Sequence, residues 1–204
     1  NDLWDCYLTY RHVGDGFDPS LGFVPRRAIN AYLAGCTFAP RPKGTFIRQM
    51  FHELYPSLVT DLGGRWESYR VFTAPVNWRL ESGDRFELNW APAGERLSEP
   101  FEIADGVVVP PGSYHWNRYR VEVGTAAKRK LAAQGAWWFG GFYGGTLDQV
   151  LLEASWTPSP LVTFLIEAER NIGRLPQGDF DLTVVGTKVR LNLSPDLQLN
   201  SFLQ

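Results

Sequence analysis

Two carboxylates are the residues of this sequence whose spacing best suits catalysis. Glu167 and Glu169 lie in an alternating segment, where a β-strand would place both on one face, about 6.6 Å apart by strand rise. Hydrolysis of a glycosidic bond uses two carboxyl groups, separated by about 5 Å or by about 6.5–9.5 Å. The pair is therefore a candidate for the acid and base of a saccharide hydrolase. A charge ladder with Lys188, Arg190 and Arg170 is the simpler alternative, because any Glu-x-Glu on a strand has this spacing.

Other catalytic and metal-binding motifs do not occur in the sequence. His12, His52 and His115 lie far apart and show none of the spacings of metal ligands. There is no G-x-S-x-G nucleophile motif. We therefore expect no metal and no cofactor.

A long connection near the N-terminus holds candidates for ligand binding. In the segment 14–27, Arg26 and Arg27 follow two aromatic residues, Phe17 and Phe23. Guanidinium groups pair well with carboxylates and phosphates, so this pattern favours acidic sugars or the phosphates of lipopolysaccharide as ligands. Tethering of the loop by its phenylalanines explains the same residues at least as well.

A second long connection, 92–112, is too apolar for a loop that extends into solvent. Its apolar side chains are Phe101, Ile103, Val107, Val108 and Val109. If the strands belong to a barrel, we expect this segment to fold back over or into the barrel mouth as a partial plug. The candidate ligand-binding residues are Arg26, Arg27 and Phe101, which lie in these two loops, and Arg190, which lies outside them.

The composition limits the classes of partner. The chain has 204 residues, 20 of them basic and 22 acidic, for a formal net charge of −2. This balance argues against nucleic acid, whose binding proteins carry a basic stripe. No apolar run is close to the length of about 18 residues that a membrane-spanning helix needs. Cys6 and Cys36 are the only cysteines; a disulfide is one option, but two buried free thiols are the favoured reading.

The elements that must position these residues are strands. Helical periodicity is nearly absent, and alternation with period two recurs between turn residues. We expect a single domain over 1–204 with about eleven strands: 3–13, 28–38, 45–61, 65–80, 85–91, 113–126, 131–142, 148–156, 160–171, 179–193 and 197–204.

The connections between these strands alternate in length. Every second one is short: 39–44, 81–84, 126–129, 157–160 and 194–196. The others include the two long connections: 14–27, 62–64, 92–112, 143–148 and 171–179. In an up-and-down meander, alternate turns lie at the same end. One end with short turns and one with longer loops is typical of outer-membrane barrels, whereas soluble sandwiches distribute long loops over both ends.

The last predicted hairpin separates a polar face from an apolar one. A turn at 194–196 would place Leu191 opposite Leu199 and Leu193 opposite Leu197. The other face would carry Lys188, Arg190, Asn192 and the glutamates of the preceding strands, Glu153, Glu167 and Glu169. Such groups must contact water or one another. The apolar face would be covered either by a second sheet, as in a soluble sandwich, or by lipid.

Several longer motifs resemble a known family. These are "GDGFDPSLGFVPRR" (14–27), "RWESYR" (65–70), "ESGDRFEL" (81–88), "PFEIADGVVVPPGSYHWNRYRVE" (100–122) and "LSPDLQLNSFLQ" (193–204). In order and spacing the chain resembles the bacterial domain-of-unknown-function family 5916. That family forms the C-terminal outer-membrane-type β-barrel of larger proteins, whose N-terminal part is similar to a family-9-type carbohydrate-binding module.

The resemblance implies a fold, a location and a set of partners. The fold is all-β, an antiparallel meander that is part of a transmembrane barrel. The location is the outer membrane of a Gram-negative-type bacterium, with the lipid bilayer, lipopolysaccharide and a saccharide as partners. The chain would be a fragment that lacks the N-terminal module and further strands. The family's barrel part has no established catalytic residues, so none is transferred.

Overall fold

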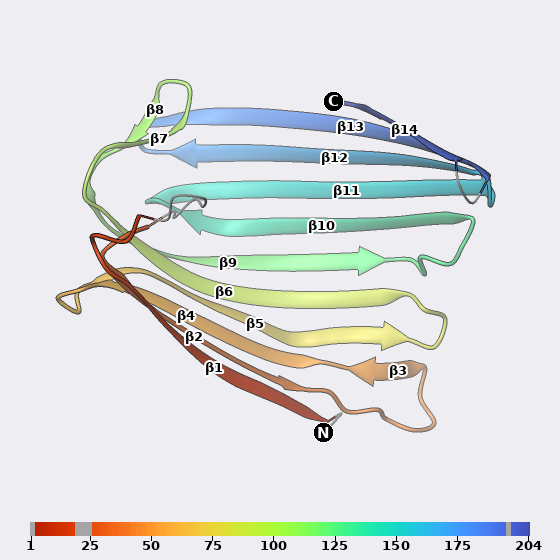
Figure 1. The fold of residues 1–204 in the computed structure, drawn as a ribbon, viewed down its shortest axis with the longest axis horizontal. Helices are drawn as coiled ribbons and strands as arrows, with labels where there is room; N and C mark the ends of the chain where they lie inside the picture. Colours follow the sequence, from red (N-terminus) through yellow and green to blue (C-terminus); the bar gives the residue numbers. More distant parts are fainter. Residues whose placement is uncertain (1–2, 19–25, 195–196) are drawn as a thin grey trace.

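The computed structural model describes residues 3–18, 26–194 and 197–204, and these form one curved antiparallel sheet with a small hairpin beside it (Figure 1). Strands account for the regular structure of this part of the chain, which contains no helix. The first seven strands are β1 (Trp4–Val13), β2 (Ile29–Phe38), β3 (Ile47–Met50), β4 (His52–Asp61), β5 (Trp66–Leu80), β6 (Arg85–Leu97) and β7 (Phe101–Ala104). The other seven are β8 (Val107–Val109), β9 (Gly112–Gly124), β10 (Leu131–Phe142), β11 (Gly145–Ser159), β12 (Val162–Leu175), β13 (Gly178–Ser194) and β14 (Leu197–Leu203).

The strand order confirms an antiparallel up-and-down meander. Neighbours in the main sheet follow the order β1-β2-β4-β5-β6-β9-β10-β11-β12-β13-β14, β3 adds to β5, and β7 pairs only with β8. The edge strands β1 and β14 lie far apart at opposite sides of the curved sheet (Figure 1). The sheet is therefore open.

The connections alternate between two ends, as the sequence predicts. We call one the loop end, at the left in Figure 1; it carries 14–28, 62–65, 98–111, 143–144 and 176–177. We call the other the turn end; it carries 39–51 with β3, 81–84, 125–130 and 160–161, and there β13 ends and β14 begins. Two predicted loops of the loop end, 143–148 and 171–179, are two-residue turns, because β11, β12 and β13 extend further than expected.

β6 is longer than the sequence predicts: it runs to Leu97, although the predicted loop begins at Pro92. Pro and Gly in this segment suggest a turn, but Gly94 has a different role. A Cβ on Gly94 would lie 2.5 Å from the ring of Tyr69, so the glycine permits close approach of a neighbouring side chain inside the sheet. The predicted loop 92–112 is thus reduced to 98–111.

That remaining segment folds back onto one face of the open sheet, whereas its role as a plug of a barrel mouth stays a prediction. Val107 and Val109 of β8 are buried in an apolar cluster with Tyr143 and Leu175. Leu97, Trp116 and Phe180 border this cluster from β6, β9 and β13. The hairpin β7–β8 therefore covers one face of the sheet at the loop end. Phe23, expected to join it, lies outside the described residues.

The expectation of two buried free thiols is wrong. Cys6 and Cys36 lie opposite each other on β1 and β2 and form a disulfide. Neither is buried, because both lie on the side of the sheet that the hairpin does not cover. Adjacent strands bring opposite Cβ atoms within reach of a disulfide, a proximity that sequence spacing alone does not reveal.

No helix among the described residues is long and apolar enough to cross a membrane.

Candidate functional site

Opposite faces of the main sheet differ sharply in chemistry. On β11, Leu152 and Trp156 point to one face, whereas Gln149 and Glu153 point to the other, since side chains alternate along a strand. We call these the apolar face and the polar face. Large residues of the apolar face that are exposed to the surroundings include Leu8, Leu54, Leu58, Trp90, Val123, Trp137, Leu152, Trp156, Phe164, Ile166, Val185 and Leu199. Within the described chain, no second layer covers them.

The final hairpin confirms most of the predicted register. Val162 lies opposite Leu191, which lies opposite Leu199, so these residues share the apolar face with Phe164 and Ile166. One predicted pair is wrong: Leu197 lies opposite Ser194 rather than Leu193, because the register shifts next to the turn. Pro195 and Asp196 of that turn are outside the described residues.

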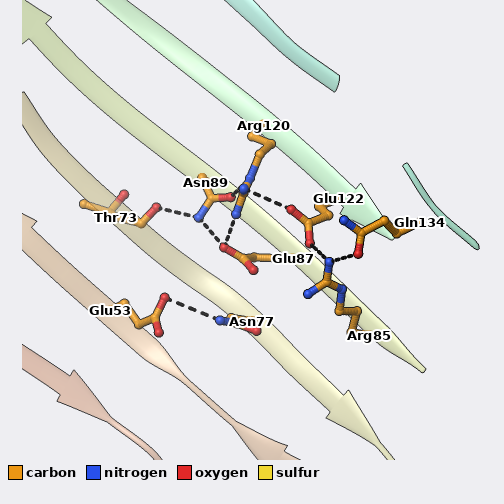
Figure 2. A network of polar contacts seen from close by, with 9 residues as sticks. All are labelled: Glu53, Thr73, Asn77, Arg85, Glu87, Asn89, Arg120, Glu122 and Gln134. Atoms are coloured by element: carbon orange, nitrogen blue, oxygen red, sulfur yellow. Dashed lines mark hydrogen bonds and ion pairs between the residues drawn. The ribbon is translucent and has the colours of Figure 1, made fainter. Parts of the chain in front are cut away.

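A network of ion pairs and amides occupies the polar face toward the turn end (Figure 2). Arg120 of β9 lies at its centre. Its guanidinium donates to Glu87, to Asn89 at 2.6 Å and to Glu122 at 2.9 Å. Arg85 bonds the second oxygen of Glu122 at 2.6 Å. Asn89 in turn donates to Glu87 at 2.9 Å, so each carboxylate in this group has at least two donors.

The network is buried although the sheet is open. Glu87, Asn89 and Glu122 are 6%, 4% and 7% exposed. Charges leave water only when partners compensate them, and here alternating residues of β6 and β9 supply both signs. The sequence contains these alternating polar residues as R-x-E-x-N over 85–89 and R-x-R-x-E over 118–122. The two patterns alone do not show that the segments lie on adjacent strands.

Three of the four predicted ligand-binding residues lie together at the loop end. Arg26, Arg27 and Phe101 border one open cleft of about 590 Å³, with Arg65 and Arg96 on the same rim. The cleft also contains carboxylates, and most of its arginines have partners. Arg27 pairs with Asp18 at 2.7 Å, and Arg65 pairs with Asp61 at 2.7 Å.

Arg26 connects the N-terminal loop to the apolar cluster. It donates to Ser68 at 2.9 Å and to Glu95 at 3.1 Å, and the other oxygen of Glu95 accepts the hydroxyl of Tyr143. Burial, followed by this hydrogen bond and the charge of Glu95, raises the pKa of Tyr143 above its usual value near 10. Phe101 lies against the same ring, with 6.2 Å between ring centroids. The contacts attach the loop and the hairpin to the sheet.

Arg190 lies away from that cleft. It is on the polar face toward the turn end, opposite Thr163 and Asn200. It shares a groove with Lys188 and Phe202. The four candidates therefore do not form one site.

Glu167 and Glu169 share the polar face, as expected for a strand, but each is already engaged. Glu167 pairs with Lys188 at 2.9 Å. Glu169 accepts bonds from Gln149 at 2.9 Å and from Asn171 at 2.8 Å. The predicted charge ladder is thus present only in part, as the pair Glu167–Lys188, because the partners of Glu169 are neutral amides.

Arg170 does not belong to that ladder. It points to the opposite face and pairs with Asp181 through two hydrogen bonds of 2.9 and 2.6 Å. The three histidines lie apart, and the described residues contain no group of three or more His, Cys, Asp or Glu side chains placed to hold a metal ion.

Comparison of the chain with models of protein families, with curated proteins and with solved structures finds no match. The function is therefore inferred from the two faces and the clefts described above.

Proposed function

We propose that this chain is part of an outer-membrane-type β-barrel that anchors, or passes material for, a saccharide-binding module of a larger envelope protein. The observation that carries the proposal is the uncovered apolar face opposite a charged, polar one. In water, such a large exposed apolar surface is unfavourable, whereas hydrocarbon would cover it without cost. Further strands between β14 and β1 would close the sheet and enclose the polar face as a lumen.

The positions of aromatic residues on the apolar face support the proposal. Toward the turn end, rings contact in pairs across neighbouring strands: Trp4–Phe38, Trp78–Phe86 and Trp156–Phe164. Toward the loop end, Tyr10 and Tyr32 contact at 5.3 Å between centroids, and Tyr69 lies in the same row. Aliphatic residues such as Leu8 and Leu54 lie between the two rows. Aromatic side chains prefer the interface between lipid and water, so two such rows are typical of a spanning sheet.

The disulfide between Cys6 and Cys36 agrees with an envelope location. Disulfides persist in oxidising compartments such as the periplasm and the cell surface. A saccharide, or the phosphates of lipopolysaccharide, would be bound at the loop end, where Arg26, Arg27 and Phe101 border the open cleft.

Adjacent leucines on opposite faces of β11 provide a test. Leu152, 56% exposed, lies on the apolar face near the middle of the strand, and Leu151 lies on the polar face opposite Glu169. We expect Leu152→Lys to lower the free energy of unfolding in phospholipid vesicles by about 2–4 kcal/mol, the cost of lysine at the centre of a bilayer. Leu151→Lys should cost less than about 1 kcal/mol, because its ammonium would meet carboxylates and water. Denaturant titration of both variants measures the difference.

The outcome separates lipid from water as the surroundings of the apolar face. In water, lysine at a half-exposed position is nearly neutral, so equal stability of the two variants would overturn the proposal. A chain that remains monomeric in buffer without detergent or lipid would overturn it too.

A further inference from the structure

A hollow of about 360 Å³ lies on the polar face between the ion-pair network and the apolar cluster. Two arginines, Arg70 of β5 and Arg118 of β9, reach it from either side of β6. Small residues make the floor: Ala91 lies opposite Arg118, and Ala93 lies opposite Arg70. This volume falls in the range of about 300–1,000 Å³ that is usual for small-ligand sites.

The two arginines differ from those of the neighbouring network in having no carboxylate within ion-pair distance among the described residues. Arg120 and Arg85 each bind glutamates, whereas neither Arg70 nor Arg118 forms an ion pair within the described part of the chain. Arg118 is only 9% exposed, and one guanidinium nitrogen donates to the carbonyl of Leu147. A guanidinium has five N–H donors, so Arg118 retains further donors for a ligand.

Arg118 is attracted by Asp148, whose carboxylate accepts the indole N–H of Trp137, and is repelled more weakly by Arg70. Two like charges in a partly desolvated site are unfavourable, and an anion placed between them removes this cost. Arg70 is held by aromatic rings rather than by an acid: its guanidinium lies 5.7 Å from the ring centroid of Phe72 and 5.6 Å from that of Trp138. The arrangement keeps the positive charge available on the polar face.

Aromatic side chains form the walls of the hollow. Trp138 borders it beside Arg70, and Trp116 and Phe142 contact at 5.7 Å between centroids on the opposite side. Flat ring faces pack against the apolar part of a ligand, while the guanidinium groups bind its charge. The site thus combines a place for an anionic group with a place for a ring.

We propose that this hollow binds a small organic anion, a carboxylate or phosphate attached to a ring. The anionic group lies between Arg70 and Arg118, and the ring lies against Trp116 and Trp138. The site does not depend on what covers the apolar face.

Titration calorimetry on the chain folded in detergent, with tryptophan fluorescence as a second readout, tests the proposal. The probes are phenyl phosphate, galacturonate, inorganic phosphate and phenol. We expect phenyl phosphate or galacturonate to bind at least about 10-fold more tightly than inorganic phosphate or phenol, because only the former supply charge and ring together. The comparison of the two favoured probes tells phosphate from carboxylate.

Variants assign the effect to the hollow. Arg118→Gln and the more exposed Arg70→Gln should each weaken binding at least about 10-fold, the loss expected for a charge-assisted hydrogen bond. Arg11→Gln is the matched control, because Arg11 shares the polar face on the edge strand β1, away from the hollow. Arg70→Gln keeps the test valid if the more buried Arg118→Gln fails to fold.

Two results would overturn the inference. One is no detectable binding of either favoured probe at concentrations up to about 10 mM. The other is binding that Arg70→Gln leaves unchanged. Neither result affects the comparison of Leu151 and Leu152, which tests the membrane proposal separately.

Discussion

Arg120 shows at the scale of one residue how the polar face is stabilised. Its guanidinium bonds Glu87, Asn89 and Glu122 and lies 5.1 Å from the ring centroid of Trp138. Removal of one partner from a buried ion pair costs about 3–5 kcal/mol, because the remaining charges stay buried without compensation. We therefore expect Arg120→Met to lower the free energy of unfolding by about this amount in a denaturant titration.

The matched control for Arg120→Met is Lys188→Met. Lys188 also pairs with a glutamate, Glu167, but both side chains are nearly half exposed. Exposed pairs contribute about 0–1 kcal/mol, so this variant should be nearly as stable as the parent chain. Equal losses for the two variants would show that burial does not decide the strength of these pairs.

Tyr143 combines an unusual backbone with a perturbed hydroxyl. Its φ of 43° is in the left-handed region, which glycine and asparagine adopt far more readily than tyrosine. The ring is nonetheless kept there, 4% exposed, by β8 and by the bond to Glu95. Packing against the hairpin compensates the strain of this two-residue turn.

The raised pKa of Tyr143 predicts a pH dependence. Because the folded state holds the hydroxyl proton more tightly than the unfolded state, the stabilisation is complete below about pH 10 and decreases as the pH rises above it. We expect the hairpin β7–β8 to detach at alkaline pH, with a change in the fluorescence of neighbouring Trp116. Tyr143→Phe has no proton to lose, so its alkaline step should disappear; a step that persists would assign the transition to another group.

Asp84 joins two adjacent connections of the turn end, 81–84 and 125–130. It accepts bonds from Arg129 at 2.6 Å, from the hydroxyl of Ser82 at 2.8 Å and from the backbone N–H of Ala126 at 2.9 Å. These bonds, that from Arg129 foremost, lower the pKa of Asp84 to about 2. The carboxylate thus connects the β5–β6 turn to the β9–β10 turn.

The pKa of Asp84 is shifted in the opposite direction to that of Tyr143, so the pH dependence of stability is also opposite. The folded state favours the ionised form, so the stabilisation is present above the usual pKa near 4 and is lost as the pH falls toward 2. We expect Asp84→Asn to lower the melting temperature at pH 6 and to have little effect at pH 2. The same decrease at both pH values would contradict this role for the charge.

The disulfide secures the edge strand β1, which pairs with β2 only. Reduction of the disulfide, or its removal by Cys6→Ser together with Cys36→Ser, should lower the free energy needed to detach β1 from β2. The expected loss is about 2–4 kcal/mol, the usual contribution of a disulfide. Hydrogen exchange of the β1 amides should become faster by a corresponding factor, while amides of β6 and β9 remain protected. Uniform acceleration over the whole sheet would mean that β1 does not open separately.

At the scale of the whole molecule, adjacent tryptophans on β10 report which surroundings each face meets. Trp137 points to the apolar face and is 47% exposed, whereas Trp138 lines the polar face. In vesicles with brominated acyl chains, we expect Trp137→Phe to reduce the fraction of fluorescence quenched by lipid and Trp138→Phe to leave it nearly unchanged. A reduction of equal size in both variants would contradict a bilayer on one face only.

Local pattern predicted the strands well where alternation is regular. The segment 131–142 is a strand with the expected bounds, and the pairing of Leu191 with Leu199 follows from the two-residue period. The prediction was less accurate around Pro92 and Gly94, where turn-type residues continue a strand because both neighbouring strands extend past them.

The all-β class, the two chemically different faces and the alternation of the connections between two ends can be predicted from the sequence, because all three depend on local periodicity and turn residues. Which distant residues meet became visible only in the folded sheet. It joined Cys6 to Cys36, grouped Arg26 with Phe101 but not with Arg190, and placed Arg70 beside Arg118 without an acid between them. These contacts depend on strand order and register across the sheet, which short-range pattern does not encode.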